Sequence, residues 1–291
     1  MPVPLSRPVT RIVPPRPVIE GAGVHLVRSI GTPELDNLDP FLLLDNFESV
    51  IPSDYRAGFP YHPHRGIETV TFVRKGQVKH SDSLGHAGSI GAGDIQWMTS
   101  GSGILHEEMP QVRPEGISGL QLWLNLPARE KMTRPKYRDL TADRLEEVET
   151  GEGAKIRVIA GEGDGGRLVG PVEGLSVRPK FLDVTLPPGA SFREAVEPGH
   201  TVFAYVEHGE VLFGPEKRKV AGPALVVFGD GDLVEASAGE GGGNFLLAAA
   251  RPLREPIARY GPFVMNTRSE IEQTLRDLRT GHFIREEPRD Q

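Results

Sequence analysis

Two histidines, His62 and His64, flank a proline in the stretch Tyr-His-Pro-His, and a third, His106, stands two positions before Glu108. Residues two apart on a β-strand point to the same face, so each pair would present its side chains together. Imidazole and carboxylate groups are ligands of divalent transition metals. The spacing of these residues therefore predicts a metal site.

On strands lining one barrel, four side chains would converge: His62, His64, His106 and Glu108. Three imidazoles and one carboxylate suit a divalent first-row metal, and an octahedral field leaves two positions for water, dioxygen or substrate. Glu68 would share the face of His64 on a continuing strand, so the spacing leaves the choice of carboxylate open. The alternative is a chance pair of histidines on an exposed loop.

The composition favours a globular β-protein with many turns. The chain has 291 residues, enough for one large or two ordinary domains. Its 35 glycines and 26 prolines are about a fifth of the residues, above the usual proportion of about 12%. A formal net charge of −7 argues against direct binding to nucleic acid.

The chain contains no cysteine, which excludes disulfides, thiolate metal sites and a cysteine nucleophile. It shows neither a signal-peptide pattern nor a long apolar run, so we expect a soluble, cytoplasmic protein with no membrane partner. A basic, proline-rich segment with Arg7, Arg11 and Arg16 predicts an extended N-terminal arm.

Runs of apolar and β-branched residues between turn residues predict strands over most of the chain. The predicted strands are 24–29, 68–74, 95–98, 120–126, 155–160, 181–186, 202–206, 224–228 and 245–250. One helix is indicated near the C-terminus, where Thr267 and Glu270 form a capping box before Ile271, Leu275 and Leu278. A shorter helix is expected near 143–149.

The two halves contain similar turns in the same order, which predicts duplicated β-barrels. The matched segments are 75–78 with 208–211, 91–94 with 229–232, and 127–130 with 252–255. Moved by the 133 positions of the first match, His62 and His64 fall on Ala195 and Glu197. The second half therefore keeps the turns without the histidines, which indicates that they serve a function in the first half.

Longer stretches resemble the pirin family of the cupin superfamily. They are Asp-Pro-Phe-Leu-Leu-Leu-Asp-Asn-Phe (39–47), Gly-Phe-Pro-Tyr-His-Pro-His-Arg-Gly (58–66), Gly-Asp-Ile-Gln-Trp-Met (93–98), Gly-Ile-Leu-His-Glu-Glu-Met-Pro (103–110) and Tyr-Gly-Pro-Phe-Val-Met-Asn-Thr (260–267). The resemblance extends from about residue 20 to 280. It implies an all-β fold of two stacked cupin barrels with a short C-terminal helix. We expect an N-terminal metal-binding barrel over 1–135 and a second barrel without ligands, carrying the helix, over 136–291.

The resemblance also implies one Fe(II) per chain, with Mn, Ni, Cu or Zn as other divalent metals that could take its place. The implied metal ligands are His62, His64, His106 and Glu108. Most other cupins would use the carboxylate at Glu68, which we therefore expect to orient an imidazole.

Pirins are similar to quercetin 2,3-dioxygenases in site architecture, which implies a dioxygenase that cleaves a flavonol or related aromatic substrate. Dioxygen and the small aromatic molecule would be its partners, and Glu108 would serve as catalytic base. The alternative is a non-enzymatic, iron- and redox-responsive regulator that binds a transcription factor or a metabolic enzyme. A purely structural metal is a third reading, and we expect a monomer. His80 and His86 are expected on a solvated loop.

Overall fold

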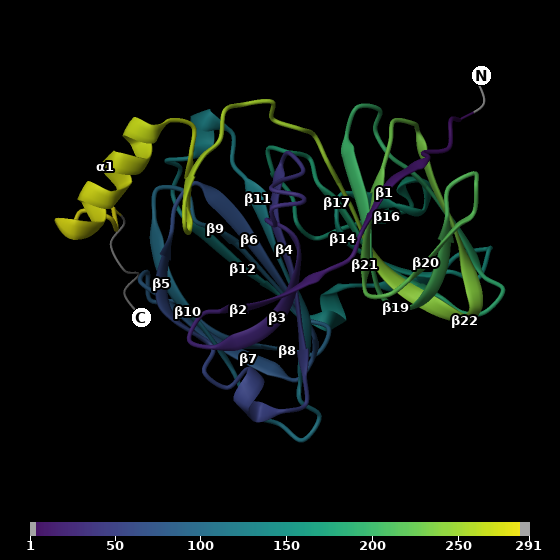
Figure 1. The fold of residues 1–291 in the computed structure, drawn as a ribbon, viewed down its shortest axis with the longest axis horizontal. Helices are drawn as coiled ribbons and strands as arrows, with labels where there is room; N and C mark the ends of the chain where they lie inside the picture. Colours follow the sequence, from purple (N-terminus) through teal and green to yellow (C-terminus); the bar gives the residue numbers. More distant parts are fainter. Residues whose placement is uncertain (1–3, 286–291) are drawn as a thin grey trace. The chain divides into compact units, whose positions relative to one another are not determined.

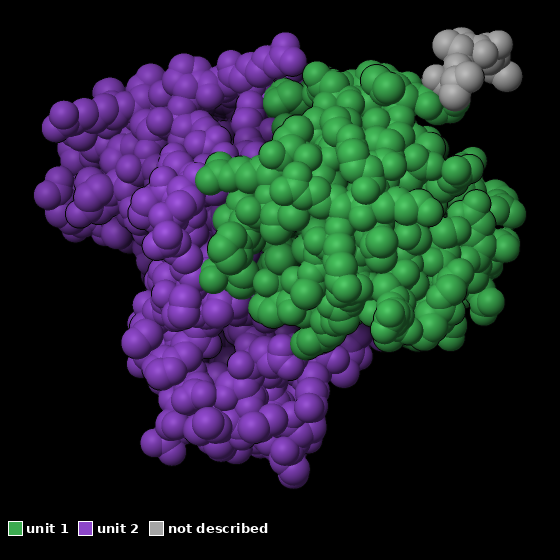
Figure 2. Space-filling view, turned by 45° about the vertical axis from the view of Figure 1, so that its right-hand side comes forward, with its two compact units in different colours: residues 1–15, 143–252 green, residues 16–142, 253–291 purple. Residues whose placement is uncertain are grey.

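The computed structural model describes residues 4–285 and forms two compact units. Figure 2 distinguishes unit 1, residues 1–15 and 143–252, from unit 2, residues 16–142 and 253–291. Each unit is discontinuous, whereas the sequence predicts contiguous domains that meet at residues 135 and 136. The difference arises because the N-terminal strand pairs within unit 1 and the C-terminal helix packs within unit 2.

No helix in residues 4–285 has the length and apolar character that crossing a membrane requires.

Unit 2 contains two antiparallel sheets, with a hairpin and a helix outside them (Figure 1). The seven-stranded sheet has the order β12-β9-β6-β11-β4-β3-β2. Its strands are β2 (Arg16–Glu20), β3 (Val24–Ile30), β4 (Phe41–Ser49), β6 (Ile67–Lys75), β9 (Ile95–Thr99), β11 (Ile117–Asn125) and β12 (Lys136–Leu140). The four-stranded sheet, β5-β10-β7-β8, contains β5 (Phe59–His64), β7 (Gln77–Asp82), β8 (Ala87–Gly91) and β10 (Ile104–Pro110). The hairpin joins β23 (Ala258–Tyr260) to β24 (Phe263–Met265).

Burial along the strands of unit 2 follows the period of the β-pleat. In β7, Val78, His80 and Asp82 are buried while Lys79 is exposed, as expected when one face of a strand points inward. The central strand β6 is buried on both faces over its first seven residues. The two sheets together line a cavity of about 500 Å³.

The C-terminal helix α1 (Arg268–Arg279) packs on β23 and β24. Its capping box is confirmed, because Thr267 Oγ1 accepts a hydrogen bond from the Glu270 amide while Glu270 Oε2 accepts one from the Thr267 amide. Its buried face includes Ile271, as predicted, but Thr274 and Asp277 are also buried, whereas Leu278 is 37% exposed.

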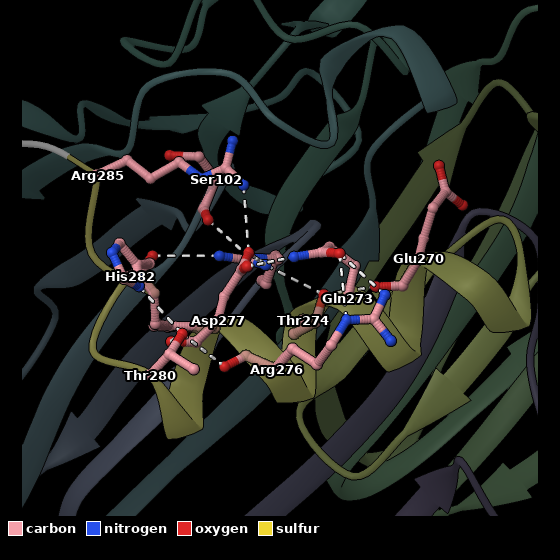
Figure 3. Close-up of polar contacts among 11 residues, drawn as sticks. Ser102, Glu270, Gln273, Thr274, Arg276, Asp277, Thr280, His282 and Arg285 are labelled. Carbon is pink, nitrogen blue, oxygen red and sulfur yellow. Dashed lines mark hydrogen bonds and ion pairs between the residues drawn. The ribbon is translucent and has the colours of Figure 1, made fainter.

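Figure 3 shows Thr274 and Asp277 within a polar network. Both side chains accept hydrogen bonds from the guanidinium of Arg65, at 3.2 Å and 2.8 Å. A buried cation needs such acceptors, and this explains why the polar residues Thr274 and Asp277 are buried. The apolar pattern of the sequence predicts that Leu278 is buried instead.

Unit 1 contains a nine-stranded antiparallel sheet of order β1-β21-β19-β22-β17-β14-β13, with β18 paired to β22 and β20 to β19. Its strands are β1 (Val9–Val13), β13 (Glu147–Glu149), β14 (Lys155–Ala160), β17 (Lys180–Leu186), β18 (Ser191–Ala195), β19 (Thr201–Phe213), β20 (Arg218–Ala221), β21 (Ala224–Phe228) and β22 (Leu233–Ala250). A separate hairpin joins β15 (Glu162–Gly163) to β16 (Leu168–Val169).

Apolar side chains form the core of unit 1. Phe245 packs edge-to-face against Phe192 and Phe213, with ring centroids 5.6 Å and 5.2 Å away. The N-terminal arm is extended as predicted, but Arg7 is buried and its guanidinium donates hydrogen bonds to the carbonyl oxygens of Glu197, His200 and Gly229. The arm up to β1 is thus an integral part of unit 1, whereas Arg16 begins β2 of unit 2.

The duplication is visible in the strand pairings of each unit. In unit 2, β6 passes through Gly76 into β7, and these strands pair with β9 and β8. In unit 1, β19 passes through Gly209 and pairs with β21 and β20 in the same way. Gly76 and Gly209 have φ angles of 81° and 75°, and a Cβ on either would lie within 2.4 Å of a backbone carbonyl oxygen. Both turns therefore require glycine.

The topology corrects one of the sequence matches. Residues 91–94 connect β8 to β9, whereas residues 229–232 connect β21 to β22. Since β21 corresponds to β9, these two turns lie one strand apart, and their similarity does not reflect the duplication. The match of 127–130 with 252–255 agrees with the topology, because each segment follows the last long strand of its barrel.

All nine predicted strands overlap observed strands. The short helix expected near 143–149 is wrong: a 3-10 turn (Ala142–Arg144) is followed there by β13. Cross-strand pairing explains the difference, since Glu147–Glu149 pair with residues 155–157 of β14.

Candidate metal centre

Strands β5 and β10 place the three predicted histidines side by side. His106 lies opposite His62 in the antiparallel pair. The ring centroid of His62 is 4.4 Å from that of His106 and 4.9 Å from that of His64, and the rings of His64 and His106 are 5.1 Å apart. One nitrogen from each ring lies within 4.8 Å of the other two. This spacing allows the three nitrogens to coordinate one ion.

The protonation state of the histidines suits coordination. Burial, reinforced by the neighbouring imidazoles, lowers the pKa of His64 and of His106 well below the usual value, so both rings are neutral. His62 Nδ1 lies 2.9 Å from the carbonyl oxygen of Pro60. A hydrogen bond donated there leaves the lone pair on Nε2.

His106 Nε2 is buried and has no hydrogen-bond partner among the residues that the structure describes. A buried polar atom of this kind requires a partner, and a metal ion would supply one. The donor set therefore fits a divalent metal ion held by three neutral imidazoles.

Glu108 lies on the same strand as His106 and lines the same cavity as His62 and His64. A β-bulge between His106 and Glu108 shifts the pairing with β5. The carboxylate lies outside the group of nitrogens within 4.8 Å, and its Oε1 accepts a hydrogen bond of 2.8 Å from Thr71. Burial raises the pKa of Glu108, although His62 and Thr71 oppose that shift.

Glu68 is buried in β6, but its observed partners differ from the expected imidazole. Its carboxylate accepts a hydrogen bond of 2.7 Å from Thr99 Oγ1, and Trp97 is a second neighbour. Burial raises its pKa. These contacts tie Glu68 to the neighbouring strand β9.

His80 is buried in the sheet, contrary to the expected solvated loop. It lies on β7 opposite Glu108, and its ring nitrogens are 2.6 Å and 2.8 Å from the hydroxyl of Tyr137. His86 stacks on the same tyrosine ring and lies 2.7 Å from Asp82. The alternation of Val78, His80 and Asp82 was the available signal for a strand with one buried face.

The cavity is mainly apolar, with a few polar groups. Its apolar and aromatic lining includes Val24, Leu26, Leu43, Phe47, Tyr55, Phe59, Val78, Ile117 and Trp123. Its polar lining includes Glu20, Arg28, Asp45, Thr71, Gln121 and Arg259. The volume and the mixed lining are those of a small-molecule site.

Comparisons with known proteins identify the family. The pirin sequence model matches residues 23–124, and that of the pirin C-terminal cupin domain matches residues 181–284. The chain belongs to the pirin family. It is 44% identical over 269 residues to a Pseudomonas aeruginosa protein provisionally named quercetin 2,3-dioxygenase, covering 91% of this chain and 94% of that protein.

Human pirin is 42% identical to this chain over 286 residues, covering 94% of this chain and 93% of the human protein. A crystal structure of quercetin 2,3-dioxygenase from Acinetobacter baumannii shares 34% identity and a TM-score of 0.85, covering 95% of this chain and 98% of that one. The two units are thus cupin domains, as the sequence predicts.

Only unit 2 of this pirin offers the histidine group. Among residues 4–285, His62, His64 and His106 form the one set of three close metal-binding side chains. The pair of β18 and β22 in unit 1 corresponds to the pair of β5 and β10 in unit 2. Ala195 lies there opposite Leu233, where unit 2 has His62 opposite His106. The duplicated pair thus carries no side chain that can bind a metal.

The segment after His64 is fixed by two buried basic side chains. Arg65 donates to the carbonyl oxygens of Ser102 and Phe283 as well as to Asp277. Lys131 donates to the carbonyl oxygens of Gly66 and Val264 and to Asn125 Oδ1, at 2.6 to 2.9 Å. Hydrogen bonds therefore join the C-terminal part of unit 2 to the residues that directly follow His64, a predicted metal ligand.

Proposed function

We propose that this pirin is a metal-dependent dioxygenase that cleaves the ring of a flavonol or a related aromatic substrate. The observation that carries the proposal is the position of the histidine group, because His62 and His64 line a 500 Å³ cavity together with the carboxyl group of Glu108. The names of the Pseudomonas and Acinetobacter relatives support this substrate class.

In this proposal the chain holds one Fe(II) through His62, His64 and His106, with Glu108 as the fourth ligand. When bound there, the ion would supply the dioxygen chemistry, and these four side chains would hold it at the cavity that receives the substrate. Mn, Ni, Cu or Zn could occupy the same donors, since imidazole and carboxylate ligands do not select strongly among these metals.

Glu108 is the proposed catalytic base. Burial raises its pKa, which makes the ionised carboxylate a stronger base than one in water. Thr71 holds Oε1 by a hydrogen bond, and Oε2 would take the proton of the substrate hydroxyl once it swings away from the ion.

Thr71 Oγ1 also lies 2.6 Å from Gln121 Oε1, yet a hydroxyl group has one proton to donate. Rotation of the Gln121 amide would let it donate to Thr71 while Thr71 donates to Glu108. Gln121 would then position the base through Thr71.

The apolar wall would exclude bulk water from the reacting substrate. Phe47, Phe59 and Trp123 supply aromatic surface around the cavity. A planar substrate would bury its rings against these side chains, and the dry surroundings would strengthen the interactions of Glu108 with the substrate hydroxyl.

Oxygen uptake tests the proposal. The protein would be loaded with Fe(II) without oxygen and then mixed with quercetin and dissolved oxygen. We expect uptake in proportion to the quercetin consumed, loss of at least about 100-fold in rate for His106→Ala, and wild-type rates for His25→Ala, which changes an exposed histidine of the same unit.

Binding of quercetin by the iron-loaded protein without oxygen consumption would overturn the dioxygenase assignment. Partner affinity that changes with the oxidation state of the iron would then favour the regulatory alternative.

A further inference from the structure

Arg259 contributes a cation to the cavity wall of unit 2. It lies on β23 and lines the same cavity as His62 and His64. Its two hydrogen bonds within the described chain are long ones to backbone carbonyls, 3.3 Å to Gly261 and 3.4 Å to Leu42. A guanidinium has five N–H groups, so Arg259 retains donors for a ligand.

The other arginine of the cavity, Arg28, is already engaged. Its Nε and Nη2 each donate to a different oxygen of Asp45 at 2.7 Å, and its Nη1 lies 2.9 Å from Glu20. This arrangement occupies all three nitrogens of the guanidinium. Arg259 is therefore the better-placed cation for an incoming anion.

Trp123 connects Arg259 to the histidine group. The indole packs edge-on against His64, with ring centroids 5.0 Å apart, and the guanidinium carbon of Arg259 lies 5.2 Å from the indole centroid. Together these distances place that carbon within about 10 Å of the His64 ring. One aromatic ring with a hydroxyl group at one end and a carboxylate at the other fits a separation of this size.

We propose that Arg259 determines substrate specificity by binding the carboxylate of an aromatic acid, whose ring lies beside Trp123 and whose hydroxyl groups face the histidines. The inference rests on the proposed function, because it names an acidic member of the proposed aromatic substrate class. A planar guanidinium suits this role, since its paired N–H groups match the two oxygens of a carboxylate.

A matched pair of ligands tests the inference without turnover. Zinc-loaded protein would be titrated with 3,4-dihydroxybenzoate and with 3,4-dihydroxybenzamide, which has nearly the same shape but no charge. We expect the acid to bind roughly 10- to 100-fold more tightly, as a charge-assisted hydrogen bond allows. Added salt should reduce this preference, because Arg259 is exposed.

Substitutions assign the preference to one residue. Arg259→Gln should bring the two dissociation constants within about twofold, and Arg259→Lys should retain part of the preference because it keeps the charge. Arg268→Gln is the control, since it makes the same charge change on the exposed face of α1. Equal binding of acid and amide by the wild type, or an unchanged preference in Arg259→Gln, would overturn the inference.

This experiment separates the inference from the proposed function. A preference that depends on Arg259, in a protein that consumes no oxygen with any aromatic substrate, would support the anion site and refute the dioxygenase. Oxygen uptake with quercetin but no preference for the acid would refute the anion site and leave the enzyme.

Discussion

Asp277→Asn tests whether the C-terminal helix supports the metal centre. Asp277 Oδ2 accepts a hydrogen bond of 2.8 Å from Arg65, whose side chain is 1% exposed and follows His64 directly (Figure 3 shows Asp277 on α1). The substitution keeps the shape of residue 277 and removes its charge. Arg65 would then be a buried cation without its carboxylate partner.

The expected loss follows from the remaining partners. Breaking a buried ion pair by removing one member costs about 3–5 kcal/mol. Arg65 keeps the carbonyl oxygens of Ser102 and Phe283 and the hydroxyl of Thr274, which still solvate part of its charge. We therefore expect a loss near the lower end, about 3 kcal/mol of unfolding free energy.

Urea unfolding of the metal-free protein measures this loss. Glu272→Gln is the control, because it breaks the exposed pair with Arg268, whose side chain is 92% exposed, and should cost at most about 0.5 kcal/mol. Metal titration of Asp277→Asn is the second assay. We expect weaker binding than in the wild type, because the loosened Arg65 adjoins His64.

A double substitution tests whether the unpaired charge of Arg65 causes the loss. Arg65→Met with Asp277→Leu removes both charges and should be less destabilised than Asp277→Asn alone, since no buried cation is left unpaired. Arg285, the other cation paired with Asp277, is 47% exposed and keeps its contact with water. A loss below about 1 kcal/mol for Asp277→Asn, or a double variant that is the least stable of the set, would contradict a buried pair that depends on its charge.

Three further predictions concern the same unit. Glu108→Gln should lower the rate of oxygen uptake at least about 100-fold. Glu68→Gln should leave metal affinity near that of the wild type. Loss of metal affinity in Glu68→Gln, together with an unchanged rate in Glu108→Gln, would make Glu68 the working carboxylate. Gly66→Ala should cost roughly 3 kcal/mol in urea unfolding, because its Cβ would lie 2.0 Å from the Val264 carbonyl oxygen; Gly261→Ala, which meets nothing within 4 Å, should cost about 1 kcal/mol. Burial lowers the pKa of Lys131 to about 7, below its value of about 10.4 in the unfolded chain. Unfolding therefore takes up a proton between these pH values, and the stability of the wild type relative to Lys131→Met should rise from about pH 7 to about pH 10; a flat or falling difference would refute this.

The histidine group could be predicted from the sequence because its information is local. Two residues at strand spacing on each of two segments, and their absence from the second half, suffice to select His62, His64 and His106. The position of the carboxylate was less accessible, because the bulge between His106 and Glu108 changes the register in a way that spacing does not reveal.

Other parts of the site depend on contacts between residues far apart in the chain. The buried face of α1 includes Asp277 because Arg65 lies beneath it, more than 200 positions earlier. Arg259 reaches the cavity because the hairpin of β23 and β24 belongs to unit 2, and no pattern in the sequence predicts where that hairpin packs. The discontinuity of the two units depends on such contacts too, since the N-terminal strand pairs with β21 near the end of unit 1.

Metal content per chain is the most direct test of a single metal centre in unit 2. Protein purified without a metal-chelating tag would be loaded with Fe(II) in the absence of oxygen, freed of unbound metal and analysed for its elements. We expect one iron per chain in the wild type and in His25→Ala, and less than about 0.1 iron in His106→Ala, since removal of one of three imidazoles breaks the donor set. Two tightly held ions per chain, or full occupancy in His106→Ala, would contradict a single metal centre formed by the histidines of unit 2.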